Sequence, residues 1–373
     1  MNYGGQGPLP DSALQAMVDS WHTLQSLGPF GSDAFPWMAR ETADLRATLA
    51  RWCGVSPDRV ALTENVTSGC VLPLWGLPFE AGERLLLSDA EHPGVVAAAM
   101  ELARRHDLHV DRFPVQRARS DADVLASLEE QLQPRTRLVA LSHLLWNTGM
   151  PMPIEPVADR LAVHPLHPWL LVDAAQAMGS LALGAGPDRA DIYAFTGHKW
   201  CCGPEGLGGV VLSQRLLATA SPTLIGWRSL ADEGHGDSPW HADARRFEVA
   251  TSCLPLGAGL RAALSALEGC GTDIARDIEI RRRSQRLWQG LRDRAGVEPL
   301  FQNVPPASGL VSFTVPGHDP QRLVTALARR GLHLRMLADP PCLRACTHVV
   351  TTDGDIDTLL EQLDALLTSG KTA

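Results

Sequence analysis

Short apolar runs alternate along most of the chain with longer segments that repeat apolar residues at helical spacing. Residues 93–107 and 120–133 are two such helical segments. Six apolar runs dense in Leu and Val are typical of buried β-strands: residues 84–89, 109–115, 136–146, 168–176, 190–197 and 206–213. Buried strands separated by helices indicate a largely parallel sheet that is covered on both faces. The pattern therefore predicts an α/β fold.

The two ends of the chain differ from this middle part. Amphipathic helices are predicted over residues 11–27 and 41–54, and a long helical region over about 256–295 leads to a final α+β segment. At 373 residues the chain is long for one ordinary core. Three parts are therefore expected: an N-terminal arm contributing to the small domain and active site (1–20), a large domain (21–255), and a linker helix with a small C-terminal domain (256–373).

Composition narrows the class of protein. Hydrophobic residues make up 45% and charged residues 20%, as in soluble globular proteins. The net charge of −9 disfavours nucleic acid as the main partner. Because no apolar stretch reaches the ~20 residues that cross a bilayer, and residues 1–10 do not resemble a signal peptide, we expect a cytoplasmic protein without a membrane partner. The eight cysteines are then expected to be mostly free thiols.

Polar residues at the ends of predicted strands are the candidates for a site, because ligands of open α/β sheets bind there. Lys199 lies between Phe195 and Trp200, two residues that suggest burial, and a buried ammonium is costly. The alternative is a lysine whose side chain extends to solvent beside a loop. Asp173 ends an apolar strand and could simply cap a helix with Gln176. However, a carboxylate and a buried lysine at two strand ends are what pyridoxal phosphate requires. The lysine forms a Schiff base and the carboxylate keeps the pyridine nitrogen protonated.

Two further segments fit that cofactor. Thr67 and Ser68 lie where a helix is expected to begin, and hydroxyl and N–H groups there form an anion site, although an ordinary helix cap has the same sequence. His92 follows a strand end, where its imidazole could stack on a flat ring. A solitary histidine is more often structural, so both assignments depend on Lys199 and Asp173.

Residues 172–180 (VDAAQAMGS) and 191–209 (DIYAFTGHKWCCGPEGLGG) resemble the signature of class V aminotransferases, the fold-type-I pyridoxal phosphate enzymes that include cysteine desulfurases. The resemblance spans nearly the whole chain. Four more stretches are particularly similar to the cyanobacterial L-cysteine/cystine C-S lyases: YGGQGPLP (3–10), LSHLLWNTGMPMPI (141–154), RFEVATS (246–252) and LRMLADPPCLRACTH (334–348). The resemblance implies a mostly parallel seven-stranded sheet in the large domain and a smaller α+β C-terminal domain.

The resemblance also implies a role for individual residues around the cofactor. Lys199 would hold pyridoxal phosphate, Asp173 would pair with the pyridinium nitrogen, Gln176 would hydrogen-bond the phenolic oxygen, and His92 would stack on the ring. The phosphate would be bound by five residues: Thr67, Ser68, Thr196, His198 and Thr251.

Thr251 would reach in from a second subunit, which implies a homodimer with a shared active site. Asn147 would lie near the substrate. Arg344, helped by Arg335, would bind the carboxylate of a small sulfur-containing amino acid through a planar fork. No metal is expected, because a zinc site built from Cys342, Cys346 and His348 would lack an obvious further ligand.

The spacing of cysteines bears on the reaction. Desulfurases need a cysteine on a mobile loop to attack the substrate sulfur. The corresponding pattern would begin at Arg335, but the route from there to Arg344 is short. Cys342 and Cys346 flank Arg344 at strand spacing, as packing residues do, although Cys342 stays open as a nucleophile. We therefore expect β-elimination of cystine, or of cysteine, to pyruvate, ammonia and cysteine persulfide or sulfide, in sulfur metabolism and iron–sulfur cluster assembly.

Other outcomes stay open at this point. They are a cysteine desulfurase, an aminotransferase or epimerase of the same family, and a cofactor-binding protein with a decayed site. The persulfide product would need a sulfur acceptor, for which a partner protein is one candidate. Because the sequence starts close to YGGQG, a short N-terminal arm could also change the shape of the pocket.

Overall fold

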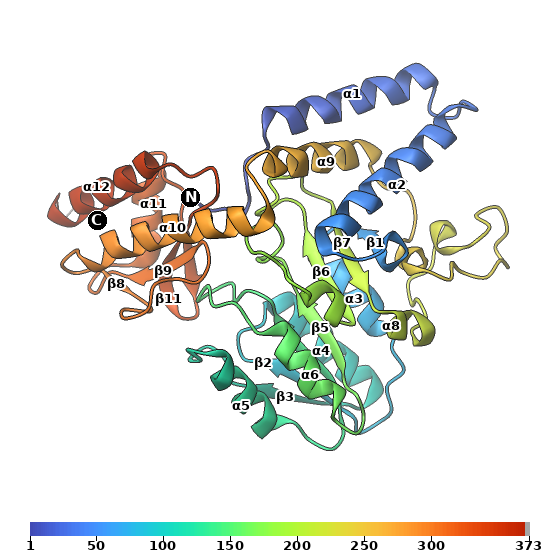
Figure 1. Ribbon diagram of the computed structural model, residues 1–373, viewed down its shortest axis with the longest axis horizontal. Helices are drawn as coiled ribbons and strands as arrows, with labels where there is room; N and C mark the ends of the chain where they lie inside the picture. The colour runs from blue at the N-terminus through green and yellow to red at the C-terminus, as the bar shows by residue number, and fades with distance from the viewer. Residues whose placement is uncertain (370–373) are drawn as a thin grey trace.

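The computed structural model describes residues 1–369 and contains two β-sheets (Figure 1). The larger sheet has the strand order β1-β7-β6-β5-β4-β2-β3. Its strands are β1 (Val60–Thr63), β2 (Arg84–Ser88), β3 (His109–Phe113), β4 (Thr136–Ser142), β5 (Trp169–Asp173), β6 (Ile192–Thr196) and β7 (Gly208–Leu212). Within this sheet only β7 runs against the other strands. The predicted mostly parallel, seven-stranded sheet is confirmed.

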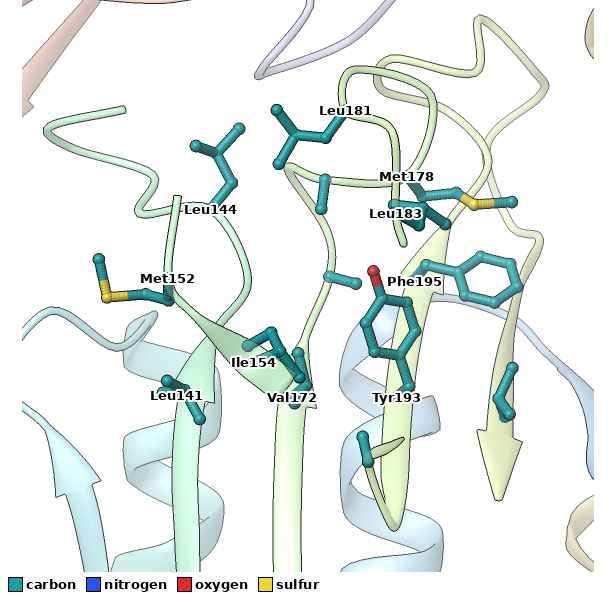
Figure 2. Packing of buried hydrophobic residues seen from close by; sticks show 14 of the residues in the cluster. Leu141, Leu144, Met152, Ile154, Val172, Met178, Leu181, Leu183, Tyr193 and Phe195 are labelled. Carbon is teal, nitrogen blue, oxygen red and sulfur yellow. The ribbon is translucent and has the colours of Figure 1, made fainter. Parts of the chain in front are cut away.

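Successive residues of the central strands alternate between two hydrophobic cores, one on each face of the sheet. On β6, Tyr193 belongs to one core and Ala194 to the other, and Val172 and Leu171 of β5 divide in the same way. Figure 2 shows Val172 and Tyr193 on the same face, together with Phe195. A strand buried on both faces has no polar alternation, which explains the continuous apolar runs of the sequence.

Helices pack against the large sheet and extend from it (Figure 1). They are α1 (Asp11–Leu27), α2 (Ala34–Cys53), α3 (Val66–Trp75), α4 (Pro93–His106), α5 (Asp121–Gln131), α6 (Ile154–Ala162), α7 (Gly186–Arg189), α8 (Gln214–Thr219) and α9 (Leu254–Glu268). Among residues 1–369, no helix is both long and apolar enough to span a membrane.

The smaller sheet is antiparallel, with the order β10-β11-β9-β8. Its elements are α10 (Asp273–Arg292), β8 (Glu298–Pro299), β9 (Leu310–Thr314), α11 (Pro320–Ala328), β10 (Arg335–Ala338), β11 (Pro341–Cys346) and α12 (Asp353–Ser369). On β11, Leu343 and Ala345 pack into the core of this smaller part, whereas Cys346 packs into the core of the larger part. Because side chains alternate along a strand, Arg344 shares the face of Cys346, toward the large sheet.

Three local features differ from what the sequence pattern indicated or left open. The sequence pattern did not predict β1, which has only four residues. The long helical region expected over 256–295 is two helices, α9 and α10, with a break at Gly269–Thr272. Asp173 does not cap a helix, because the residues that follow it form turns.

Candidate active site

The carboxyl ends of the central strands lie side by side at one edge of the large sheet. Ser142 at the end of β4 is in register with Asp173 at the end of β5, and Asp173 is in register with Ala194 of β6. The chain continues from β6 through Thr196 directly to Lys199. This parallel register brings the predicted site residues of three strands to one edge.

Lys199 lies in a protein-enclosed environment at this edge. Burial lowers the pKa of the Lys199 ammonium from 10.5 to about 8. The carboxylate of Asp173 opposes that shift, while the guanidinium groups of Arg344 and Arg335 add to it. A substantial fraction of a lysine with this pKa is the neutral, nucleophilic amine near pH 8.

Asp173 is buried, and its Oδ1 accepts a hydrogen bond from the N–H of Ala175 at 2.8 Å. The side chain of His92 caps α4, because its Nδ1 accepts from the N–H of Gly94 at 3.2 Å. Burial lowers the pKa of His92, and the charge of Lys199 lowers it further, against the opposite influence of Asp173. His92 is therefore both a helix cap and a ring facing the charges of the site.

The residues predicted to bind phosphate come from the start of α3 and the end of β6. The side chain of Asn65 accepts from the N–H of Ser68 at 3.0 Å and so caps α3. A Cβ at Gly69 would fall 3.0 Å from the Cβ of Ala194, so the first turn of α3 lies tightly against β6. Beyond β6, Thr196 Oγ1 and His198 Nδ1 lie 2.8 Å apart. A helix N-terminus and hydroxyl groups here form the type of surroundings that bind anions.

Thr67 completes this region from the first turn of α3. A Cβ built on Gly94 would lie 3.6 Å from Thr67 Oγ1, so the N-termini of α3 and α4 lie close together. Thr67 is exposed and Ser68 is half-buried. Both are accessible to a ligand from the open side of the edge.

Arg344 reaches the site from the smaller sheet and is only 1% exposed. Its Nη1 donates to the carbonyl oxygen of Trp146 at 2.6 Å, while Nε and Nη2 have no hydrogen-bond partner among the described residues. Arg335 is in register with Arg344 on the adjacent strand and is exposed. A buried guanidinium with two unpaired nitrogen atoms is costly unless an anion pairs with it, so Arg344 offers a fork for a carboxylate.

Asn147 lies between the two parts of the chain and is 2% exposed. Its Nδ2 lies 3.4 Å from the carbonyl oxygen of Asp339, and its Oδ1 accepts from the N–H of Thr148 at 2.8 Å. Its own carbonyl oxygen accepts a hydrogen bond from Ser312 at 2.6 Å. These contacts fix the loop after β4 against the smaller sheet, beside Arg344.

Thr251 is the predicted residue whose role depends on a second chain. It is exposed, in the segment between Phe247 and α9. A role in phosphate binding from a second subunit stays a prediction, since one chain cannot test it.

The cysteines near the site are buried thiols. Burial raises the pKa of Cys342 to about 11 and that of Cys202 to about 12. The described residues contain no group of three or more His, Cys, Asp or Glu side chains that could hold a metal ion. His348 instead stacks on Tyr3, with 4.4 Å between the ring centroids, and hydrogen-bonds the carbonyl oxygen of Trp200.

Sequence reasoning included Glu91 in the polar run 88–92 at a strand end but gave it no role of its own. Its carboxyl group receives hydrogen bonds from Ser88 Oγ at 2.5 Å and from the N–H and Oγ of Ser142 at 2.8 and 3.0 Å. Burial, with a smaller contribution from Asp173, raises the pKa of Glu91 to about 7. The available signal was an acidic residue directly before His92, at the end of a buried strand.

The contacts of Gly4 and Trp200 with Gln176 were not predicted from the sequence. The carbonyl oxygen of Gly4 accepts from Gln176 Nε2 at 2.9 Å, and Trp200 Nε1 donates to Gln176 Oε1 at 2.8 Å. A Cβ at Gly4 would fall 2.8 Å from Arg344 Nη2. The N-terminal segment therefore packs between Gln176 and Arg344, where the sequence analysis expected an arm near the site without assigning its contacts.

Comparison with known proteins identifies the family. The model of the family described as aminotransferase class V matches residues 7–353. The chain belongs to the class V aminotransferase family. Isopenicillin N epimerase of Streptomyces clavuligerus is 32% identical, over 98% of this chain and 94% of that enzyme. A cysteine desulfurase of Haloferax volcanii is 24% identical, over 95% and 86%.

Among solved structures, the cystine C-S lyase C-DES in complex with its reaction product cysteine persulfide is 41% identical. The match has a TM-score of 0.92 and covers 97% of this chain and 96% of that one. A mutant of C-DES carries glycine covalently linked to its PLP cofactor, with a TM-score of 0.93. These matches confirm the fold-type-I architecture expected from the sequence.

Proposed function

We propose that this class V enzyme is a pyridoxal-phosphate-dependent carbon–sulfur lyase that cleaves cystine to pyruvate, ammonia and cysteine persulfide. The residues present fit the cofactor. Lys199 has a pKa of about 8 and lies near the Asp173 carboxylate, and the N-terminus of α3 provides anion-binding groups beside Thr196 and His198. When bound, the cofactor supplies an electron sink for the electrons of the Cα–H bond.

The feature that best supports elimination over desulfuration is the short β-hairpin that runs from Arg335 to Arg344. The strands β10 and β11 pair from these residues down to Ala338 and Pro341, so only two residues join them. The hairpin has one cysteine, Cys342, which is 0% exposed and is a protonated thiol near neutral pH because its pKa is about 11. A mobile nucleophilic thiolate of the kind that a desulfurase needs has no place in this hairpin.

The roles of the residues follow from their positions. Arg344 would bind the substrate carboxylate through its unpaired Nε and Nη2 atoms, with Asn147 beside it. Asp173 would pair with the pyridine nitrogen, and Thr67 and Ser68 would bind the phosphate. The amine of Lys199 would take the proton from Cα, and its lowered pKa favours the neutral amine that this proton transfer requires.

Borohydride trapping and turnover of cystine together test the proposal. The chain has only two lysines, Lys199 and Lys371. Reduction of the cofactor-loaded protein with borohydride should add the mass of the cofactor to the peptide that contains Lys199 and leave the Lys371 peptide unchanged. Incubation with cystine should release equal amounts of pyruvate and ammonia, and Lys199→Ala should release neither.

Three results would contradict the lyase proposal in different ways. Alanine formed without pyruvate would indicate a desulfurase. Consumption of cystine that requires an added keto acid and yields no pyruvate would indicate an aminotransferase. A trapped cofactor without turnover of any sulfur amino acid would indicate a binding protein.

Epimerisation is a second candidate function, because isopenicillin N epimerase is 32% identical over nearly the whole chain. Both reactions begin with loss of the Cα proton. They differ in whether a sulfur group leaves Cβ or a proton returns to the opposite face of Cα. In deuterium oxide, an epimerase would convert an L-amino acid without a leaving group into its deuterated D-form, whereas the lyase proposal expects no D-amino acid.

We further propose that the protein acts as a homodimer and that persulfide passes to an acceptor in the cytoplasm. Large apolar side chains are exposed on α2 and on the segment between α8 and α9, which include Phe35, Leu224 and Trp227. A cleft of about 710 Å³ lies between Phe35 and Trp227. A second copy of the chain would cover this apolar surface.

A further inference from the structure

Trp200 directly follows the cofactor lysine and is completely buried. Its indole ring is held from several sides. The rings of Tyr3 and His348 stack on it at centroid distances of 6.2 and 6.0 Å, and a Cβ at Gly309 would fall 2.8 Å from its Cη2. His348 also hydrogen-bonds the carbonyl oxygen of Trp200 at 2.9 Å. The indole N–H therefore has a fixed direction.

That N–H determines how the amide of Gln176 is oriented. An indole nitrogen can only donate a hydrogen bond, and a backbone carbonyl can only accept one. Trp200 Nε1 lies 2.8 Å from one end of the Gln176 amide and the carbonyl oxygen of Gly4 lies 2.9 Å from the other. The oxygen of the amide must therefore face Trp200, and its NH₂ group must face Gly4. The second N–H of that NH₂ group stays available to another acceptor.

We infer that Trp200, together with the carbonyl of Gly4, is a positioning residue that fixes Gln176 as a hydrogen-bond donor toward the phenolic oxygen of the cofactor. The inference rests on the proposed function, since it requires pyridoxal phosphate on Lys199. A flipped amide would present its oxygen, which repels a phenolate. Gln176 is 5% exposed, so no bulk water could replace the donor.

The expected consequence is a change in proton affinity at the cofactor. A hydrogen bond donated to the phenolic oxygen disperses negative charge, and that charge holds a proton on the adjacent Lys199 nitrogen. Without the donor, the proton is held to a higher pH. A lost hydrogen bond of ordinary strength corresponds to a rise of about 0.5–1 pH unit in the midpoint of the colour change of the bound cofactor.

Two substitutions at position 200 separate the hydrogen bond from the volume of the ring. Trp200→Phe removes the N–H and should raise the midpoint by that amount. Histidine is smaller than phenylalanine, but its five-membered ring places Nε2 where the indole places Nε1. In Trp200→His, the midpoint should therefore stay close to that of the wild type. Trp200→Met serves as a second variant without the donor if the Phe variant does not retain cofactor. Spectrophotometric pH titration of the holoprotein gives the midpoint for each.

A double-mutant cycle and a matched tryptophan complete the experiment. Gln176→Met should raise the midpoint, and adding Trp200→Phe to it should raise it no further, because Trp200 acts through Gln176. Trp169→Phe is the control, since Trp169 is also buried but its Nε1 has no hydrogen-bond partner within residues 1–369. The midpoint of this variant should equal that of the wild type.

Two sets of results are informative in different ways. Equal midpoints in the wild type and Trp200→Phe, equal shifts in the Phe and His variants, or additive shifts with Gln176→Met would overturn the positioning role while leaving the lyase proposal intact. A wild-type protein that takes up no cofactor would instead overturn the proposed function, and this inference with it.

Discussion

At the scale of single residues, Lys199 is a half-buried amine whose pKa is lowered by its surroundings. Lysine occurs only at positions 199 and 371, so arginine supplies the other 31 of the 33 basic residues. Arginine is always charged near neutral pH, whereas a buried lysine can be neutral. Arginine could therefore not replace Lys199, because the proposed chemistry needs a neutral amine. The scarcity of lysine elsewhere was a further sequence signal that marks this position.

The cofactor-free protein should be stabilised by Lys199→Met. The Lys199 pKa is about 8 in the folded chain and 10.5 ordinarily, so the unfolded chain binds more protons between these two values. The burial penalty is fully present below about pH 8 and disappears as the pH rises toward about 10.5. We expect the variant to be about 1–3 kcal/mol more stable near pH 7, with the difference shrinking by about pH 9.5.

Urea unfolding of both cofactor-free proteins at the two pH values measures this difference. Glu91 also titrates near pH 7, but it is present in both proteins, so its contribution cancels. A variant that is less stable than the wild type near neutral pH would show that Lys199 is not a destabilising charge.

At the scale of elements, a buried ion pair joins α2 to the large sheet. Arg46 of α2 contacts both carboxylate oxygens of Glu248, at 2.7 and 3.3 Å, and both residues are 8% exposed. Glu248 Oε1 also accepts from the N–H of Leu62 on β1, at 2.9 Å. Despite Arg46, burial keeps the pKa of Glu248 above its ordinary value. This pair connects α2, β1 and the segment that leads to Thr251.

Arg46→Met should therefore destabilise the protein by about 3–5 kcal/mol, because it leaves a buried carboxylate without its partner. Adding Glu248→Gln should recover part of the loss, since an amide can still accept from Leu62 without a charge. Urea unfolding at pH 7 would give both values. Arg104→Met is the control, because its ion pair with Glu101 is at the surface and should contribute little. An Arg46→Met cost no larger than this control would refute the argument.

The elements that the sequence predicted share one property: their hydrophobic pattern is local. Buried strands such as β5 and β6 are continuous apolar runs, so their positions and the site at their carboxyl ends could be predicted. The four residues of β1 are too few for a periodic signal. The contacts of Gly4 with Gln176 and Arg344 join residues more than 170 positions apart, and no local pattern encodes such a contact. The roles of Gln176, Thr251 and Arg344 were predicted from the family resemblance, because the spacing of residues alone does not indicate them.

At the scale of the whole molecule, one segment of the single chain carries a group of exposed apolar side chains. The segment between α8 and α9 projects away from the large sheet, at the right of Figure 1. It carries the exposed side chains of Leu224, Ile225 and Trp227, and Thr251 lies near its C-terminal end. In the proposed dimer, this segment would cover the partner's site, so that each phosphate pocket contains groups from both chains.

A hybrid dimer tests whether Thr251 acts across the interface. Lys199→Ala should be inactive, and Thr251→Glu should be nearly so, because its carboxylate would repel the phosphate. If the two chains share sites, a dimer with one copy of each variant contains one site with a native Lys199 and a native Thr251, contributed by different chains. Such dimers, separated by two different affinity tags, should have about half the activity of the wild-type dimer on cystine. If Thr251 served its own chain, every site in the hybrid would carry one of the two lesions, and no activity would return. Full activity of Thr251→Glu alone would remove Thr251 from the site altogether.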